Sequence, residues 1–148
     1  MKKHLIVLSL IFLVFSCKKD QAELDMTEIE EYVAEKGLDG AYTDEGIFYV
    51  IHEPGGDAKP NGSHTITADY EGKYTDDVIF DSSYERGEPL EFTLNRVIAG
   101  WQIGIPLIGK GGAITLVIPS EYAYGSNPPF PIRENAVMVF DVELLDFM

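Results

Sequence analysis

The chain has 148 residues, which is enough for one folded domain and a short leader or tether. Its hydrophobic fraction of 45% and its aromatic fraction of 11% are sufficient for a packed core and exclude a wholly disordered chain. The formal net charge of −14 argues against nucleic acid as a partner, because phosphate groups would repel an acidic surface with no evident basic patch.

The first residues have the pattern of an export signal. Lys2 and Lys3 precede an apolar run at residues 5–15, which is too short to cross a bilayer as a helix but fits the hydrophobic region of a signal peptide. The run leads into Val-Phe-Ser-Cys, ending at Cys17, and this segment resembles the bacterial lipobox. We therefore expect residues 1–16 to be a signal peptide that is removed on export.

Cys17 is then expected to become the lipid-anchored first residue of the mature chain. It is the one cysteine in the sequence, so an intramolecular disulfide is excluded and a free exposed thiol is the alternative. The expected location is the bacterial cell envelope, anchored in a membrane by lipid, on the periplasmic side of the outer membrane or on the cell surface.

A tether and a short helix are predicted after this cysteine. Residues 18–25 are polar and are predicted to form the tether. Thr27 and Glu30 match a capping box, apolar residues recur after them at helical spacing, and Gly37 is a favourable terminator. These signals predict a helix over residues 27–36, for which packing on the domain and association of two copies are both open.

From residue 43 onward the apolar residues recur with a period of two, which indicates strands. The predicted strands are residues 46–52, 65–71, 78–80, 90–94, 114–118 and 137–145. Residues 97–104 are apolar without alternation and are predicted to form a short buried helix despite their glycines. Many strands with one helix predict an α+β fold in which a twisted antiparallel β-sheet wraps around that helix.

Several short motifs occur in a fixed order within residues 64–148. They are Tyr70-Glu71-Gly72, Phe80-Asp81-Ser82-Ser83, Arg86-Gly87 with Pro89, Val97-Ile98, Gly100-Trp101, Gly111-Gly112, Ile118-Pro119, Tyr122-Ala123-Tyr124-Gly125, Asn135-Ala136 and Phe140-Asp141-Val142-Glu143-Leu144. Each motif alone is a weak signal, but their joint occurrence at fitting spacing is specific. On these motifs the segment resembles the FKBP-type peptidyl-prolyl isomerases, and the helix at 27–36 resembles the lead-in segment of exported bacterial members.

The resemblance implies the function and divides the chain. It implies that proline-containing segments of exported polypeptides are the partners, and that the domain accelerates cis/trans rotation of their X-Pro bonds. The expected parts are residues 1–16 as signal peptide, 17–42 as lipidated cysteine, tether and short helix, and 43–148 as the isomerase domain.

The reaction itself sets modest chemical requirements. Amide resonance makes rotation cost about 18–20 kcal/mol, whereas the two isomers before proline differ by only about 0.5–1 kcal/mol. No covalent bond breaks, so neither a nucleophile nor a metal nor another cofactor is expected. The twisted amide is less polar than the planar one, so a dry pocket walled by aromatic rings favours it. Lowering the barrier by roughly 4 kcal/mol accelerates rotation about a thousandfold.

The resemblance assigns two groups of site residues. Those expected to be catalytic are Tyr70, Phe80, Asp81, Ile98, Trp101, Tyr124 and Phe140. Those expected to bind substrate are Arg86, Leu90, Val97, Phe130 and Ile132. In this assignment Trp101 is the floor of the proline pocket, the Ile98 N–H and the Tyr124 hydroxyl bond the substrate, and Asp81 lies near the carbonyl of the twisting bond.

Two local features follow from these roles. A regular strand would point the neighbours Phe80 and Asp81 to opposite faces, so the chain is expected to bend or bulge there. Arg86 is expected to pair with Asp81, although a surface carboxylate is an alternative partner. Leu90 stands where other members often carry an aromatic residue, which leaves macrolide binding open.

Other functions are less consistent with the sequence. The segment from Gly104 to Lys110 nearly spells a P-loop, but Gly111 occupies the position that requires Ser or Thr. His52 and His64 lack the spacing of metal ligands. The main alternative is a chaperone module that holds proline-containing segments in the same pocket with little turnover.

Overall fold

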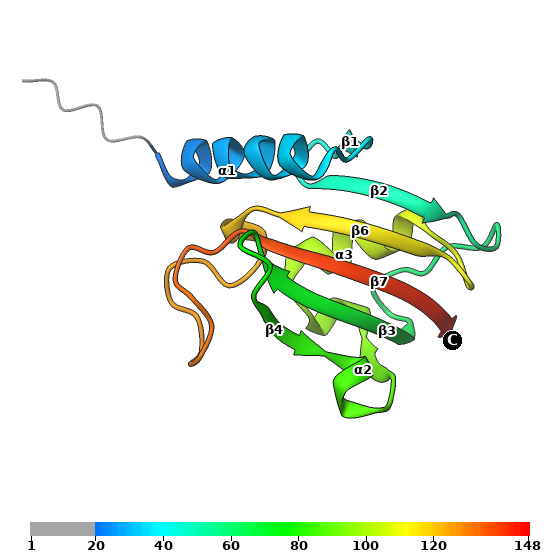
Figure 1. Ribbon diagram of the computed structural model, residues 1–148. Helices are drawn as coiled ribbons and strands as arrows, with labels where there is room; N and C mark the ends of the chain where they lie inside the picture. The colour runs from blue at the N-terminus through cyan, green and yellow to red at the C-terminus, as the bar shows by residue number, and fades with distance from the viewer. Residues whose placement is uncertain (1–19) are drawn as a thin grey trace, which may run out of the picture.

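The computed structural model describes residues 20–148; the predicted signal peptide (1–16) and the predicted lipidation site Cys17 lie outside this part of the chain. Within it, seven strands form one antiparallel sheet in the order β1-β2-β6-β7-β3-β4, with β5 also paired to β3 (Figure 1). The strands are β1 (Ala41–Tyr42), β2 (Phe48–Glu53), β3 (Thr65–Tyr74), β4 (Ile79–Ser82), β5 (Leu90–Thr93), β6 (Ala113–Ile118) and β7 (Met138–Phe147).

The helical elements are short apart from the first. They are α1 (Gln21–Lys36), α2 (Ser83–Arg86) and α3 (Ala99–Gly104), with 3-10 turns η1 (Leu94–Arg96), η2 (Ile105–Leu107) and η3 (Ser120–Tyr122). The predicted α+β class, with an antiparallel sheet and few helices, is confirmed. The two-residue strand β1 was not predicted, because so short a segment carries no readable period.

The sheet packs one face against α3, as the alternation of β3 requires. Alternate residues of β3 are buried, among them Ile66, Ala68 and Tyr70, and they join the main core. The two glycines of α3 explain how a helix fits there. A Cβ on Gly100 would lie 2.5 Å from the Ile118 side chain of β6, and one on Gly104 would lie 2.5 Å from the Leu116 side chain. The glycines therefore let α3 lie directly on β6.

Helix α1 covers one end of the opposite face (Figure 1). Its residues Ile29 and Tyr32 are buried in a second apolar cluster with Val117 of β6 and Val139 of β7. Strand β6 is consequently buried on both faces from Ile114 onward, which alternation alone does not predict. In residues 20–148 no helix is both long and apolar enough to cross a membrane.

The predicted start of α1 is wrong. The helix begins at Gln21, so residues 21–25 are helical and belong to no tether. Thr27 lies inside the helix, where its hydroxyl donates to the Glu23 carbonyl (2.9 Å), and it makes no capping box. Tertiary packing extends the helix, since Asp25 and Ile29 are both buried. The predicted end is confirmed: Gly37 has a φ of 61°, and its N–H bonds the Ala34 carbonyl.

Candidate active site

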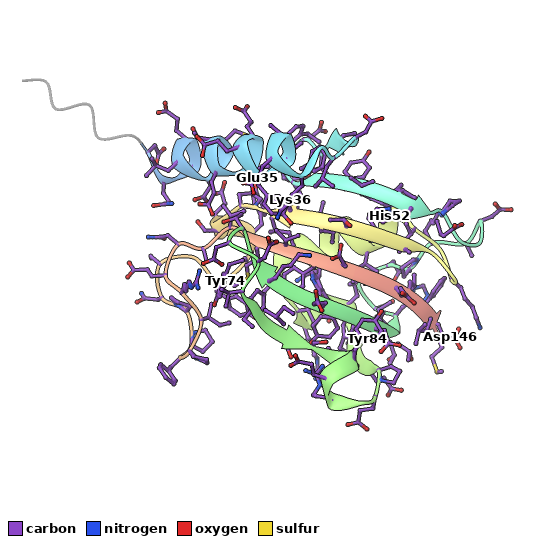
Figure 2. All side chains as sticks on the ribbon, viewed as in Figure 1. Glu35, Lys36, His52, Tyr74, Tyr84 and Asp146 are labelled. Carbon is purple, nitrogen blue, oxygen red and sulfur yellow. The ribbon has the colours of Figure 1, made fainter. Side chains whose placement is uncertain are left out.

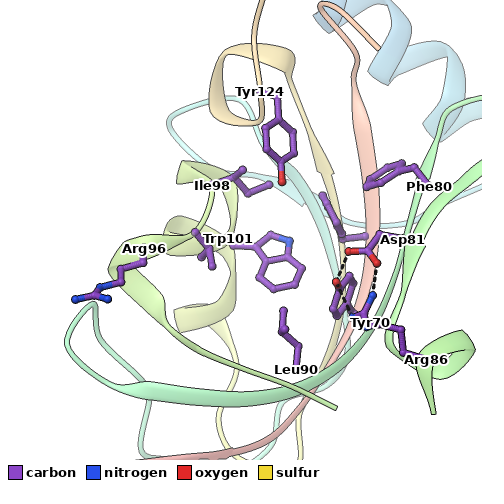
Figure 3. A pocket seen from close by; sticks show the side chains of 11 residues that line it. Tyr70, Phe80, Asp81, Arg86, Leu90, Arg96, Ile98, Trp101 and Tyr124 are labelled. Carbon is purple, nitrogen blue, oxygen red and sulfur yellow. Dashed lines mark hydrogen bonds and ion pairs between the residues drawn. The ribbon is translucent and has the colours of Figure 1, made fainter. Parts of the chain in front are cut away.

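A cavity of about 470 Å³ opens between β3, β4, β5, α3, β7 and the segment after η3 (Figure 3). Its lining residues are Tyr70, Phe80, Asp81, Arg86, Leu90, Arg96, Val97, Ile98, Trp101, Tyr124 and Phe140. The structure thus brings together the seven residues expected to be catalytic and three of the five expected to bind substrate. Arg96 was not predicted; it extends outward from the mouth of the cavity (Figure 3).

The inner wall of the cavity is a cluster of packed rings. Trp101 makes edge-to-face contacts with Tyr70 (ring centroids 5.0 Å apart) and with Phe140 (5.2 Å). Phe80 meets Phe140 in the same manner, at 5.6 Å. Behind Trp101 lies Phe92 (5.2 Å), a supporting residue that the motifs did not single out. Since Tyr70, Trp101 and Phe140 are each 4% exposed, the wall is almost completely shielded from bulk water.

A β-bulge in β4 brings Phe80 and Asp81 to the same cavity. Asp81 pairs with Gly72 of β3 and Ile79 pairs with Lys73, so Phe80 is the extra residue between them. The bend expected from the sequence is therefore present. Gly72 makes room for it, because a Cβ there would lie 2.7 Å from the Phe140 ring and 2.8 Å from the Phe80 ring.

A polar triad closes one side of the cavity. The Tyr70 hydroxyl donates to one oxygen of Asp81, and the Arg86 guanidinium pairs with the other (Figure 3). Arg86 also donates to the Tyr70 hydroxyl oxygen, at 3.0 Å. The expected partnership of Arg86 with Asp81 is thus present, and the carboxylate is held by groups from both β3 and α2.

Two serines fix the helix that carries Arg86. The Ser82 hydroxyl accepts from the Glu85 N–H (3.3 Å) and caps the start of α2. The buried Ser83 hydroxyl accepts from the Tyr70 N–H (2.9 Å) and donates to Asp69 (2.7 Å), which joins α2 to β3. The sequence motif contained both serines, but nothing in their spacing revealed these partners.

Burial and hydrogen bonding change the acidity of the two cavity tyrosines. Burial, and then the hydrogen bond to Asp81, raises the pKa of Tyr70 to about 12, while the hydrogen bond from Arg86 opposes this shift. Burial also raises the pKa of Tyr124. Both hydroxyls are protonated at neutral pH. That of Tyr70 is committed to Asp81, whereas that of Tyr124 points into the cavity (Figure 3).

Ile98 occupies the N-cap position of α3, where its carbonyl accepts from the Trp101 N–H at 3.0 Å. This cap sets the start of the helix that presents Trp101. The side chain of Ile98 lines the cavity across from the triad, and Leu90 of β5 lies lower in the same view (Figure 3). Val97 also lines the cavity.

Phe130 and Ile132, expected to bind substrate, do not line the cavity. Phe130 is 99% exposed, and Ile132 packs against the edge of the core. Their loop is drawn toward the β3–β4 turn by Arg133, whose guanidinium lies 4.0 Å from the centroid of the Tyr74 ring and pairs with Asp76 at 2.8 Å. Residues 104–110, which nearly spell a P-loop, form a turn within the core, where Ile105 and Ile108 are fully buried.

Comparisons with known proteins agree with this geometry. Residues 56–145 match the model of the family described as FKBP-type peptidyl-prolyl cis-trans isomerase. The chain therefore belongs to the FKBP-type peptidyl-prolyl cis-trans isomerase family. Among curated proteins it is similar to the FKBP-type peptidyl-prolyl cis-trans isomerase FkpA of Escherichia coli K12, with 46% identity over 117 residues, or 79% of this chain and 43% of the relative.

Two solved structures extend the comparison. The crystal structure of FkpA from Escherichia coli has a TM-score of 0.77 and 41% identity, covering 85% of this chain and 60% of that one. The crystal structure of AtFKBP13 has a TM-score of 0.69 and 31% identity, covering 75% of this chain and 100% of that one. The chain thus matches the whole of a short relative but spans less than half of the curated FkpA.

Proposed function

We propose that this protein is a peptidyl-prolyl cis-trans isomerase that accelerates X-Pro rotation in polypeptides by holding the twisted amide without covalent chemistry. The observation that carries the proposal is the single cavity in which the buried rings of Tyr70, Trp101 and Phe140 adjoin the carboxylate of Asp81. Membership of the FKBP-type family supports it.

In this mechanism the proline ring lies on the indole of Trp101, between the rings of Tyr70 and Phe140. The Ile98 N–H and the Tyr124 hydroxyl bond substrate carbonyls and fix the peptide on either side of the imide. Asp81 lies beside the carbonyl of the rotating bond. Because the amide loses conjugation as it twists, the apolar wall costs the twisted form less than the planar forms, and the barrier falls.

The test is the exchange rate of an Ala-Leu-Pro-Phe peptide, followed by NMR with residues 20–148 present in small molar deficit. We expect cis and trans peptide signals to broaden as their exchange accelerates, with saturation at high peptide concentration. Asp81→Ala and Tyr124→Phe should each lower the rate by at least about tenfold with the fold intact. Binding of the peptide without any change in exchange would support the chaperone module instead.

The loop that carries Phe130 and Ile132 is proposed to contact substrate residues beyond the proline. The support is the full exposure of the Phe130 ring on a loop that Ile132 and Arg133 anchor to the core. Phe130→Ala should change the preference among longer peptides while the rate on a tetrapeptide stays the same. Leu90 replaces the aromatic residue that other family members often carry, and titration of Trp101 fluorescence measures whether a macrolide still binds.

We further propose that the domain acts in the cell envelope, tethered by lipid on Cys17. The support is the sequence of residues 1–17, since the positive start, the short apolar run and the cysteine occur in the order of a lipoprotein precursor. Mass spectrometry of the mature protein should find the chain beginning at Cys17 with acyl chains attached. Cys17→Ala should leave an unlipidated precursor.

A further inference from the structure

Asp25 is a buried carboxyl group that the proposed mechanism does not use. It lies in α1 and is 1% exposed, and no other Asp or Glu of residues 20–148 is as fully buried. Its Oδ2 accepts two hydrogen bonds from one residue, the backbone N–H (2.7 Å) and the hydroxyl (2.5 Å) of Ser120. Its Oδ1 accepts from the Gln21 side chain at 2.6 Å.

Docking of α1 does not require a carboxylate at this position. The helix is already held by Ile29 and Tyr32 in the second apolar cluster. At its end Lys36 points toward the sheet (Figure 2) and pairs with Asp77 of the β3–β4 turn at 2.5 Å. Burying a carboxyl group carries a desolvation cost that an apolar residue would avoid. The hydrogen bonds to Ser120 therefore call for a different explanation.

Ser120 is the fixed point of the turn that carries Tyr124. Its carbonyl oxygen accepts from the N–H groups of Ala123 (3.0 Å) and Gly125 (2.9 Å), the two neighbours of Tyr124 in the chain. Gly125 has a φ of 61°, which closes the turn, and its carbonyl accepts from the Asn135 N–H. The N–H and hydroxyl of Ser120 thus bind α1 through Asp25, and its carbonyl oxygen binds the two residues that flank Tyr124.

We infer that Asp25 is a positioning residue: through Ser120 it fixes the turn that aims the Tyr124 hydroxyl into the cavity. The inference rests on the proposed function, because Tyr124 matters to rate only if the cavity acts on peptides. It makes α1 a support of the cavity, since this helix holds the turn that presents Tyr124.

Two substitutions separate positioning from a general structural role. Asp25→Ala leaves both Ser120 donors unpaired in a buried place. In Asp25→Asn the side-chain oxygen can still accept the hydrogen bonds from Ser120. Its NH2 group can donate to the side-chain oxygen of Gln21 once the Gln21 amide has rotated. We expect Asp25→Ala to lower kcat/KM by about tenfold, since small misplacements at a site cost rate, and Asp25→Asn to retain the wild-type value within about twofold.

A double-mutant cycle then tests the route. If Asp25 acts through the Tyr124 hydroxyl, Asp25→Ala should have no further effect on kcat/KM in a Tyr124→Phe background. Leu144→Ala is the control for a loss of core packing, because Leu144 is fully buried and lies at the end of β7 opposite to Met138, which pairs with Ile118 just before the Ser120 turn. It should lower stability and leave kcat/KM unchanged at temperatures where the protein is folded. If the reductions in kcat/KM caused by Asp25→Ala and Tyr124→Phe multiplied in the double variant, the inference would be overturned.

Amide hydrogen exchange keeps this test separate from the proposed function. In Asp25→Ala the N–H groups of Ala123 and Gly125 should exchange faster, with no such selective change in Asp25→Asn or Leu144→Ala. An active wild type in which Asp25→Ala alters neither these amides nor kcat/KM would refute the inference and leave the isomerase proposal standing. A wild type without isomerase activity would refute the proposed function, and the amides would still report whether Asp25 holds the turn.

Discussion

Asp81 is held in the cavity wall by two side chains from different elements, the hydroxyl of Tyr70 on β3 and the guanidinium of Arg86 on α2. Since Arg86 also bonds Tyr70, the three groups restrain one another, and the carboxylate cannot turn away without breaking two interactions. One consequence can be measured without any substrate, because the raised pKa of Tyr70 couples folding to pH.

The folded protein holds the Tyr70 proton more tightly than the unfolded chain does, because the pKa rises from 10.0 to about 12 on folding. Its contribution to stability is therefore complete below pH 10 and is lost as the pH rises toward 12. This loss amounts to about 2 kcal/mol. Urea unfolding at pH 9 and at pH 11.5 measures this loss. Between these two pH values the free energy of unfolding should fall less in Tyr70→Phe than in the wild type. An equal loss in both proteins would contradict the assigned burial and bonding of Tyr70.

At the scale of elements, the close contact of α3 with β6 sets the depth of the cavity floor. Gly100 and Gly104 lie one helical turn apart and face Ile118 and Leu116, so the helix approaches the strand as closely as its backbone allows. Trp101 follows directly after the first of these glycines. Its height in the cavity therefore depends on the absence of a side chain at position 100.

Gly100→Ala tests this dependence. A Cβ 2.5 Å from the Ile118 side chain must push α3 outward, so we expect a loss of about 1–3 kcal/mol in the free energy of unfolding. Trp101 is the one tryptophan, so its fluorescence reports on the cavity alone, and its emission should shift to longer wavelength as water enters.

Gly62→Ala is the control, because a Cβ at Gly62 meets Asn95 at an ordinary 3.5 Å. It should change neither stability nor emission. If Gly100→Ala behaved like this control, the proposed role of the close helix–strand contact would be wrong.

The elements also show how far the sequence predicts this protein. The strands other than β1, and the buried helix α3, follow from the apolar pattern of the sequence. The bulge at Phe80 follows from the roles that the family resemblance implies for Phe80 and Asp81. The early start of α1 does not, because the burial of Asp25 depends on Ser120, 95 positions away. The exposure of Phe130 does not follow either, because its loop contacts Tyr74 through Arg133, 59 positions further along the chain, and no local pattern indicates that contact.

At the scale of the whole molecule, the sheet has a different helix on each face, and both faces serve the cavity. Helix α3 supplies Trp101 from one face, and α1 reaches the Tyr124 turn from the other through Asp25 and Ser120. The resemblance in residues 64–148 predicted ten of the eleven residues that line the cavity, missing Arg96 and adding Phe130 and Ile132, which lie outside it. The contribution of α1 lies outside the motifs of that segment and required the three-dimensional contacts.

In the proposed mechanism the cavity holds a twisted imide better than either planar isomer. The most direct test is the exchange rate between cis and trans forms of an X-Pro peptide while it is bound, measured by NMR with the protein in saturating excess. We expect the bound barrier to lie several kcal/mol below the free value of about 18–20 kcal/mol. A bound peptide that rotates no faster than the free peptide would contradict the account.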